Sequence, residues 1–309
     1  MTSAADRSGV HAPLASGREK LVGHAAMVLF AFLIAWSFSL GALAVPYIES
    51  APLNALRFVV GTTIMGVVAA ILRPSDLRLP TAPWRFAVLG SLMATYFVTM
   101  FMALQITDPV STGAVFTLGP LMATVFGYFV LHQRPTPVIL LSLVFAGLGS
   151  LWVIFKGDID AILAFQVGKG ELIFLVGCAG HALYAPMVKR LNRGEPVLIF
   201  TFWTLFATML WISAYGAPQI VATDWAAMPA IVWGVIAYLA IFTTACTFFL
   251  VQFASLRLPS SKVLSYVYLT PVFIIFMEGF LGHGWVGFPI LAGALVTVLG
   301  LVVLAFSAD

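Results

Sequence analysis

The chain has 309 residues, of which 61% are hydrophobic and only 9% are charged, and its mean hydropathy is +1.06. Soluble domains carry about 25% charged residues, so this composition excludes a soluble protein. The 15 Lys/Arg and 12 Asp/Glu residues give a net charge of +3. They are too sparse and too scattered for a nucleic-acid-binding surface, so the basic balance has to be explained by where the cations lie.

Long apolar runs recur to the end of the chain and predict an all-α integral membrane protein. The strands of a β-barrel would be about 10 residues long and would alternate in polarity. Windows of about 19 residues predict ten spans, which cover residues 24–45, 52–72, 85–104, 110–131, 137–155, 170–189, 197–215, 230–253, 260–281 and 286–306. Cys178 and Cys246 both lie within apolar runs and suggest neither a disulfide nor a metal site.

The distribution of cations between alternate loops predicts the orientation. Residues 1–22 are polar and are interpreted as a cytoplasmic tail. With that tail inside, the cytoplasmic segments hold 12 of the 15 cations, whereas the outside segments hold only Lys156 and Lys169. Short cytoplasmic loops are enriched in Lys and Arg. Both termini are therefore predicted to be cytoplasmic.

The second half of the sequence resembles the first at an offset of 151 residues. The matched pairs are Ala103 with Ala254, Pro120 with Pro271, His132 with His283, and Gly149 with Gly300. General similarity of composition between membrane helices is the alternative explanation. A duplication gives two five-helix repeats, 23–155 and 168–309, joined by an external linker at 156–167. Because five is odd, the copies insert in opposite orientations, an arrangement typical of secondary transporters that work by alternating access.

Several segments resemble EamA-type transporters of the drug/metabolite transporter superfamily. Among them are AWSFSLGALAVPYI (35–48), PLNALRFVVG (52–61) and GELIFLVGCAGHALYAPMVKRL (170–191). The resemblance, which extends to bacterial exporters of aromatic amino acids, implies two inverted five-helix repeats in a bacterial inner membrane and transport without a cofactor. The family commonly ends its fourth and ninth spans with Leu-Gly-Glu, but this chain has Leu-His-Gln at 131–133 and Leu-Gly-His at 281–283. No role of that glutamate can be transferred to this chain.

Polar and aromatic residues within the spans define a candidate substrate cavity. His181 lies about 11 residues, roughly 16 Å, into the sixth span, and Tyr184 lies on the same face of the helix. The predicted cavity residues are Trp36, Ser39, Tyr96, Thr99, Phe116, His181, Tyr184, Thr243 and Tyr266. Helix packing is the alternative role for each residue taken singly, and for His181 the alternative is an interhelical hydrogen bond.

Four residues are candidates for a hinge or a gate. Pro120 and Pro271 each lie about 11 residues into their spans and are expected to bend them. Arg57 and Glu278 lie at matching depths near the external ends of spans two and nine. They either extend to the membrane interface or pair with each other as an external gate. Lys262, one turn inside the cytoplasmic end of the ninth span, is interpreted as a positive-inside anchor, and a role as a ligand for the substrate is the alternative.

These features predict a secondary transporter that exports small metabolites, most specifically aromatic or large neutral amino acids. A permease for drugs or other neutral metabolites is the alternative. The middle of the membrane offers rings, hydroxyls and one imidazole, and a multiply charged solute would need cations there. The predicted partners are the substrate and the lipid bilayer, and no nucleic acid is expected.

Other functional classes find less support in the sequence. An enzyme is not expected, because no Asp lies in the interior of a span and HExxH, GxSxG and CxxC are absent. No metal site or cofactor is predicted. A channel would need a selectivity filter or a ring of charge, and neither is visible. The chain has no GxxxG motif, so nothing argues for a dimer and the sequence is consistent with a monomer.

Overall fold

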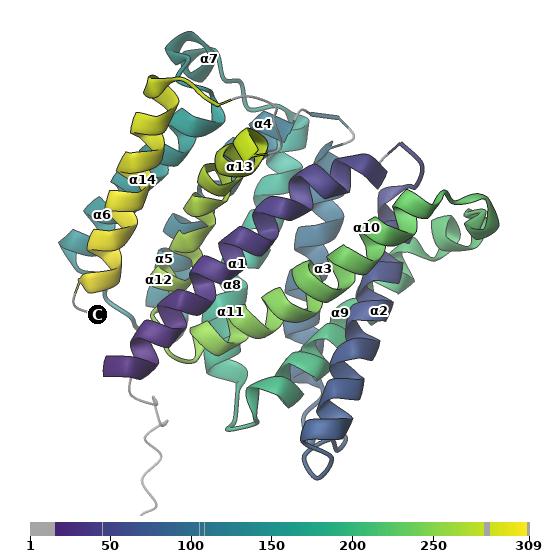
Figure 1. Cartoon of the computed structure of the whole chain (residues 1–309). Coiled ribbons are helices and arrows are strands. Elements are labelled where there is room, and N and C mark those ends of the chain that lie inside the picture. Colours follow the sequence, from purple (N-terminus) through teal and green to yellow (C-terminus); the bar gives the residue numbers. More distant parts are fainter. Residues whose placement is uncertain (1–15, 45, 105, 108, 281–284, 308–309) are drawn as a thin grey trace, which may run out of the picture.

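All secondary structure in the described part of the computed structural model is helical (Figure 1). The structure describes residues 16–44, 46–104, 106–107, 109–280 and 285–307, so most of the predicted tail at 1–22 lies outside the described residues. The helices are α1 (Gly17–Ala44), α2 (Ser50–Leu72), α3 (Trp84–Leu104), α4 (Pro109–Phe116), α5 (Gly119–Leu131), α6 (Pro137–Ile154), α7 (Ile159–Leu163), α8 (Lys169–Leu191), α9 (Val197–Ala222), the 3-10 helix η1 (Trp225–Ala227), α10 (Ala230–Ala240), the π-helix η2 (Ile241–Cys246), α11 (Thr247–Ser255), α12 (Ser260–Ser265), the 3-10 helix η3 (Tyr266–Tyr268), α13 (Leu269–Phe280) and α14 (Phe288–Phe306).

Nine segments of the described chain are long and apolar enough to cross a membrane, as judged by length and composition. They are Gly17–Trp36, Ser50–Leu72, Thr112–Leu131, Pro137–Ile154, Lys169–Leu191, Val197–Ala222, Ala230–Ser255, Ser260–Met277 and Phe288–Phe306. Each coincides with one of the ten predicted spans. The remaining predicted span, 85–104, coincides with α3, a 21-residue helix that packs along α8 and α9.

Local sequence explains where several helices begin and end. The hydroxyl of Thr136 accepts a hydrogen bond from the backbone N–H of Ile139, and Pro137 occupies the first position of α6, where an N–H is not needed. Helix α5 ends at His132, which adopts a left-handed conformation with φ 56°. Asp158 caps the short helix α7 in the linker between α6 and α8. The turns therefore fall close to the positions that Pro and Gly predict.

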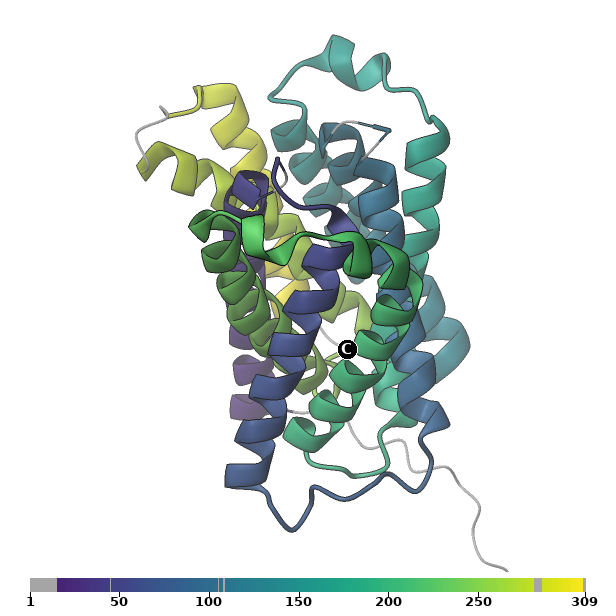
Figure 2. The ribbon, with the colours of Figure 1, turned by 90° about the vertical axis from the view of Figure 1, so that its right-hand side faces the viewer.

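The helices form a bundle in which segments distant in sequence are neighbours. The most extensive pairings join α3 to α8, α6 to α14 and α2 to α9. In both views α7 lies at one end of the bundle and the loop after α2 lies at the other (Figures 1 and 2). Large apolar side chains such as Val67, Phe129 and Val221 are exposed, as expected for surfaces that face lipid. The core between the helices holds most of the buried aromatic residues.

Candidate functional site

Two of the spans are interrupted near their middle. The fourth breaks between α4 and α5, and the ninth passes through η3 between α12 and α13. Pro120 and Pro271 lie in the first turns of the helices that follow these breaks. The hydroxyl of Tyr268 donates a 2.9 Å hydrogen bond to the carbonyl of Thr117, which ties one break to the other. The helices are thus interrupted where the prolines predict a bend, and the role of the prolines as hinges stays a prediction.

Four rings from α3, α4 and α8 pack together and are called the central ring cluster: Tyr96, Phe116, Phe174 and His181. The His181 ring lies 4.6 Å from that of Tyr96 and 5.6 Å from that of Phe116. Phe174 lies 5.9 Å from Tyr96 and 6.1 Å from Phe116. Nδ1 of His181 is buried and has no hydrogen-bond partner among the described residues. The structure thus brings three of the predicted cavity residues into contact.

The cluster depends on a close approach between α3 and α8. A Cβ atom on Gly177 would collide with Oγ1 of Thr99 and would lie 3.3 Å from the carbonyl oxygen of Tyr96, so this close spacing favours glycine. Oγ1 of Thr99 donates to the carbonyl of Thr95 at 2.8 Å. His181 follows Gly177 by four residues and lies on the same face of α8. Gly177 therefore allows the rings of Tyr96 and His181 to meet.

Arg57 is buried instead of extending to the interface. Its side chain turns inward from α2 and is 5% exposed, so the interpretation that it snorkels is wrong. Nε donates to the hydroxyl of Thr244 at 2.9 Å, and the guanidinium also donates to the carbonyl of Thr243 at 3.2 Å. A third, 3.4 Å bond runs to the amide oxygen of Asn54, and the ring of Phe97 lies 4.8 Å from the guanidinium carbon. None of the ion pairs in the described part of the chain involves Arg57.

The partners of Arg57 on the eighth span belong to the π-helix η2. Thr243 is the fourteenth of the 26 residues of the segment Ala230–Ser255, so the guanidinium reaches the middle of that span. Short π-helical turns inside α-helices are frequent at functional sites. The predicted cavity residue Thr243 therefore contributes through its carbonyl to the surroundings of a buried cation.

A second buried polar group joins α8, α9 and α11. The amide nitrogen of Gln252 donates to the hydroxyl of Tyr184 at 2.7 Å, and the hydroxyl of Thr201 donates to the Gln252 amide oxygen at 2.6 Å. Gln252 and Thr201 are 0% exposed and Tyr184 is 2% exposed. The predicted cavity residue Tyr184 is thus held by hydrogen bonds in the core.

Aromatic rings connect these groups across the bundle. Phe97 lies 5.0 Å from Tyr96 of the central ring cluster and 5.1 Å from Phe58. Phe58 lies 5.7 Å from Phe248, which lies 6.1 Å from Tyr184. The central ring cluster together with Phe58, Phe97, Phe248 and Tyr184 is called the aromatic network. Consecutive rings of this network are neighbours from the imidazole of His181 to the ring of Tyr184, and the guanidinium of Arg57 lies beside Phe97 and Phe58 of the network.

The other predicted site residues lie elsewhere. Trp36 packs against Phe32, with 6.5 Å between ring centroids. The hydroxyl of Tyr266 is hydrogen-bonded to Nδ1 of His24 at 2.8 Å. Neither belongs to the aromatic network. Two further predicted residues have side chains outside the described part of the structure, namely Ser39 and Glu278. The predicted pairing of Glu278 with Arg57 therefore stays a prediction.

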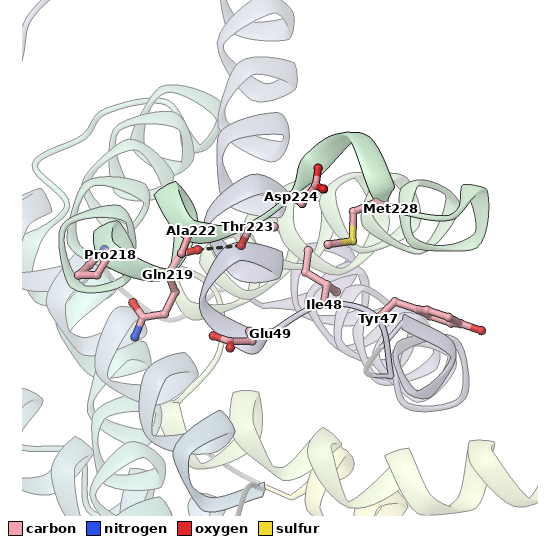
Figure 3. Close-up of a pocket in the computed structure, with 9 residues that line it drawn as sticks. All are labelled: Tyr47, Ile48, Glu49, Pro218, Gln219, Ala222, Thr223, Asp224 and Met228. Carbon is pink, nitrogen blue, oxygen red and sulfur yellow. Dashed lines mark hydrogen bonds between the residues drawn. The ribbon is translucent and has the colours of Figure 1, made fainter.

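Two neighbouring hollows open at the predicted external end of the bundle and are together called the vestibule. The larger, of about 440 Å³, is lined by Tyr47, Ile48, Glu49, Pro218, Gln219, Ala222, Thr223, Asp224 and Met228 (Figure 3). The smaller, of about 110 Å³, shares Glu49 and Gln219 with it. Asn54 and Phe97 also line the smaller hollow, and both contact Arg57. The vestibule therefore ends beside the buried guanidinium.

Polar contacts join the helices at the opposite, predicted cytoplasmic end. Arg85 is 1% exposed, forms an ion pair with Glu195 and donates to the carbonyl of Leu191 at 2.6 Å. Partial burial opposes the charge on Glu195, but hydrogen bonds from Arg85 and from backbone N–H groups, with the charge of Arg85, lower the pKa of this carboxyl below its ordinary value of 4.5. The amide oxygen of Gln133 accepts the N–H of Ser260 at 3.1 Å. These contacts connect α3, α5, α8 and α12 at this end.

Lys262 also lies at this predicted cytoplasmic end, and its side chain is buried. Its side chain is 0% exposed, and Nζ donates to the carbonyl of Ser307 at 2.7 Å. The ammonium group is thus buried inside the bundle at this end, and its role as a positive-inside anchor stays a prediction. The interaction links the ninth span to the C-terminal end of α14.

Sequence reasoning missed three residues of this region. Phe97 and Phe174 were not distinguished from the other Phe residues, because an apolar ring in an apolar run gives no sign of which way it points. Gln252 carries no charge, so the rule that marks ionisable residues within spans does not apply to it. A neutral amide inside the apolar run 247–255 was nevertheless a usable signal, since a buried amide needs hydrogen-bond partners.

The helical spans and the buried polar core define a multi-pass membrane protein. The chain belongs to the EamA-like transporter family, whose sequence profile matches residues 21–155 and again residues 168–306. A protein named "Uncharacterized transporter YyaM", from Bacillus subtilis (strain 168), is 24% identical over 278 residues, which cover 88% of this chain and 89% of that protein. A solved structure titled only "Crystal structure of protein" has a TM-score of 0.74 at 19% identity and covers 93% of this chain and 96% of its own.

These comparisons confirm the family that the sequence motifs resemble. The protein is a membrane transporter, and the family is one of transporters rather than of enzymes. The similar solved structure supports the fold alone, because the identity is low. The names of these two similar proteins mention no substrate, so the expectation of amino acid export depends on the residues of this chain.

Proposed function

We propose that this protein is a secondary transporter that exports aromatic or large neutral amino acids across a bacterial inner membrane by alternating access. The carrying observation is the position of Phe116, the last residue of α4 before the break in the fourth span. Its ring packs against His181 and Tyr96. A shift of the broken helix would separate these rings and leave a site with aromatic walls and an imidazole. Ligand sites are largely apolar with a few polar groups, and a large neutral amino acid fits this description.

Reciprocal contacts support two inverted repeats. A Cβ on Gly149 would meet the backbone and side chain of Thr297, and a Cβ on Gly300 would meet those of Ala146. At the offset of 151 residues, Gly149 corresponds to Gly300 and Ala146 corresponds to Thr297. The contact of Gly149 with Thr297 is therefore equivalent to the contact of Gly300 with Ala146, with the two halves exchanged. The family profile also matches the chain twice. Inverted repeats that meet at an axis allow one half to rock against the other.

The two ends of the bundle differ in a way that supports alternating access. The vestibule opens at one end, while Arg85, Glu195, Gln133 and Ser260 join the helices at the other. We propose that this conformation faces outward and that both termini are cytoplasmic. A single cysteine placed at Asp224 should then react with an impermeant reagent added outside cells, and one at Arg193 should not. The reverse pattern would overturn the orientation.

The substrate class is tested by exchange in liposomes that contain the purified protein. Liposomes are loaded in separate runs with phenylalanine, threonine, a sugar phosphate or a cationic dye, and exchange against the same labelled solute outside is followed. Phenylalanine is expected to exchange fastest, and the sugar phosphate is not expected to exchange. Exchange of the sugar phosphate without the amino acids would refute the proposal. Exchange of the dye alone would favour a drug permease.

A matched pair of variants tests the central ring cluster. Phe116→Ala removes a ring from the cluster, whereas Phe129→Ala removes a ring that is 70% exposed on α5. We expect Phe116→Ala to raise the KM for phenylalanine by about fivefold, because a buried aromatic contact contributes on the order of 1 kcal/mol. Phe129→Ala should leave the KM unchanged. Equal KM values for the two variants would refute the proposal that Phe116 belongs to the substrate site.

A further inference from the structure

Among the described residues, Arg57 has no acidic partner for the positive charge that it carries inside the membrane-spanning part of the protein. Its three hydrogen-bond acceptors are the hydroxyl of Thr244, the carbonyl of Thr243 and the amide oxygen of Asn54, and all three are neutral. Buried charges are normally paired with an opposite charge, and ionisable residues within spans usually mark substrate or ion pathways. A guanidinium kept here without a carboxylate partner among the described residues is suited to an anionic ligand.

The vestibule gives a ligand access to this charge. The smaller hollow is lined by Asn54 and Phe97, and these residues contact the guanidinium from the side of the vestibule. The hydrogen bond from Arg57 to Asn54 is the longest of the three, at 3.4 Å, and a bond of this length is weak. A ligand oxygen that arrives through the hollow can therefore replace Asn54 without disturbing the two bonds to η2.

The rings beside Arg57 fix what kind of anion fits. The guanidinium carbon lies 4.8 Å from the centroid of Phe97 and 5.4 Å from that of Phe58. One ring further along is Tyr96, which belongs to the central ring cluster. A ligand with its anionic group on Arg57 would thus place its body among aromatic rings. Arginine binds carboxylates through two parallel N–H groups.

We propose that Arg57 binds the carboxylate of the transported solute and that the substrates of this protein are monocarboxylates with a large apolar body. This inference rests on the proposed function, because it names the group by which the transported amino acid is held. It adds that the carboxylate is required and that the ammonium group is not. A second carboxylate would find no further cation near the network among the described residues, so dicarboxylates are disfavoured.

Analogues of phenylalanine test the proposal on the unmodified protein. Each analogue competes with labelled phenylalanine, or with labelled 3-phenylpropanoate, in liposome exchange. The carboxylate without an ammonium group, 3-phenylpropanoate, should compete within about tenfold of phenylalanine. Phenylalaninamide, which lacks the carboxylate, should compete roughly 10- to 100-fold less well, the range expected for a lost charge-assisted hydrogen bond. Equal competition by phenylalaninamide would overturn the proposal. This test does not depend on the folding of any variant.

Two substitutions at Arg57 add a test of the residue itself. In Arg57→Gln, phenylalanine and phenylalaninamide should compete about equally well, so the preference for phenylalanine is lost. Arg57→Lys should retain part of the preference because the charge remains. Arg78→Gln, in the exposed loop after α2, should keep the full preference. A purely structural role of Arg57 would lower the amount of folded protein and leave the preference unchanged, and that result would contradict the proposal.

The failures of the two proposals are distinguishable. If 3-phenylpropanoate exchanges but amino acids do not, the amino acid assignment is wrong and the carboxylate site stands. If amino acids exchange and phenylalaninamide competes equally well, amino acid transport stands and the role of Arg57 is wrong. Exchange of neutral drugs alone, with no carboxylate transported, would overturn both.

Discussion

Gly149 provides a stringent test of how the two halves of the protein meet, because it lies at the contact of α6 with α14. A Cβ at this position would lie 2.7 Å from the carbonyl oxygen of Gly293 and 2.8 Å from the backbone nitrogen of Thr297. Ordinary contacts begin at 3.4 Å, so in Gly149→Ala the backbone of α14 would have to retreat by about 0.7 Å. The 3.4 Å hydrogen bond from the hydroxyl of Thr297 to the carbonyl of Ala146 would be lost with it.

Gly234→Ala is the matched control for this substitution. Gly234 also lies inside a helix, α10, but nothing lies within 4 Å of its Cβ position. Both substitutions gain the same helix propensity, up to about 1 kcal/mol in water, so the difference between them isolates the steric cost. Overpacking of this kind costs about 1–3 kcal/mol. Because membrane proteins often unfold irreversibly, the two variants and the unmodified protein are compared by thermal unfolding in detergent at one scan rate.

The expected result is a lower unfolding temperature for Gly149→Ala than for Gly234→Ala, by about 2–4 °C per kcal/mol of steric cost. Equal unfolding temperatures would mean that α6 and α14 are not packed backbone to backbone. That outcome would refute the reciprocal contact from which the inverted repeats are argued.

Three further predictions follow from other contacts. Because the pKa of Glu195 is lowered in the folded protein, its stabilisation is present above pH 4.5 and is lost as the pH falls below that value; in Glu195→Gln the unfolding temperature should vary less over this range. Gln252→Leu leaves the buried hydroxyl of Tyr184 without its donor and should lower the free energy of unfolding by about 1–3 kcal/mol, measured by unfolding in detergent. Replacing Pro120 and Pro271 by alanine should slow exchange in liposomes while the protein stays folded, and unchanged rates would refute the hinge role.

The course of the helices could be predicted well from the sequence, because apolar length and turn residues act locally. The predicted spans 52–72 and 137–155 differ by no more than two residues at either end from α2 and α6. The interruptions of spans four and nine were also predictable, since proline removes a backbone hydrogen bond wherever it lies in a helix. The π-helix η2 was not predicted, because nothing in the sequence 241–246 distinguishes an inserted turn from a regular one.

The candidate site could be predicted only in part, because depth in a span does not give the direction of a side chain. Arg57 was placed near the interface from the position of its backbone, yet its long side chain reaches the middle of the neighbouring span. Tyr96, Phe116 and His181 were grouped by depth alone and do meet. Trp36 was grouped in the same way, but its ring packs against that of Phe32 in the same helix, α1. Which rings meet depends on which helices face each other in the bundle. A single sequence does not show which helices are neighbours.

Trans-stimulation tests the central claim, carrier transport of amino acids by alternating access, most directly. Labelled phenylalanine is loaded into liposomes that contain the purified protein, and its efflux is measured with and without unlabelled phenylalanine outside. Alternating access predicts that external phenylalanine accelerates the efflux, because the substrate-bound protein returns across the membrane faster than the empty one. Efflux that external phenylalanine leaves unchanged, or no efflux at all, would contradict the account.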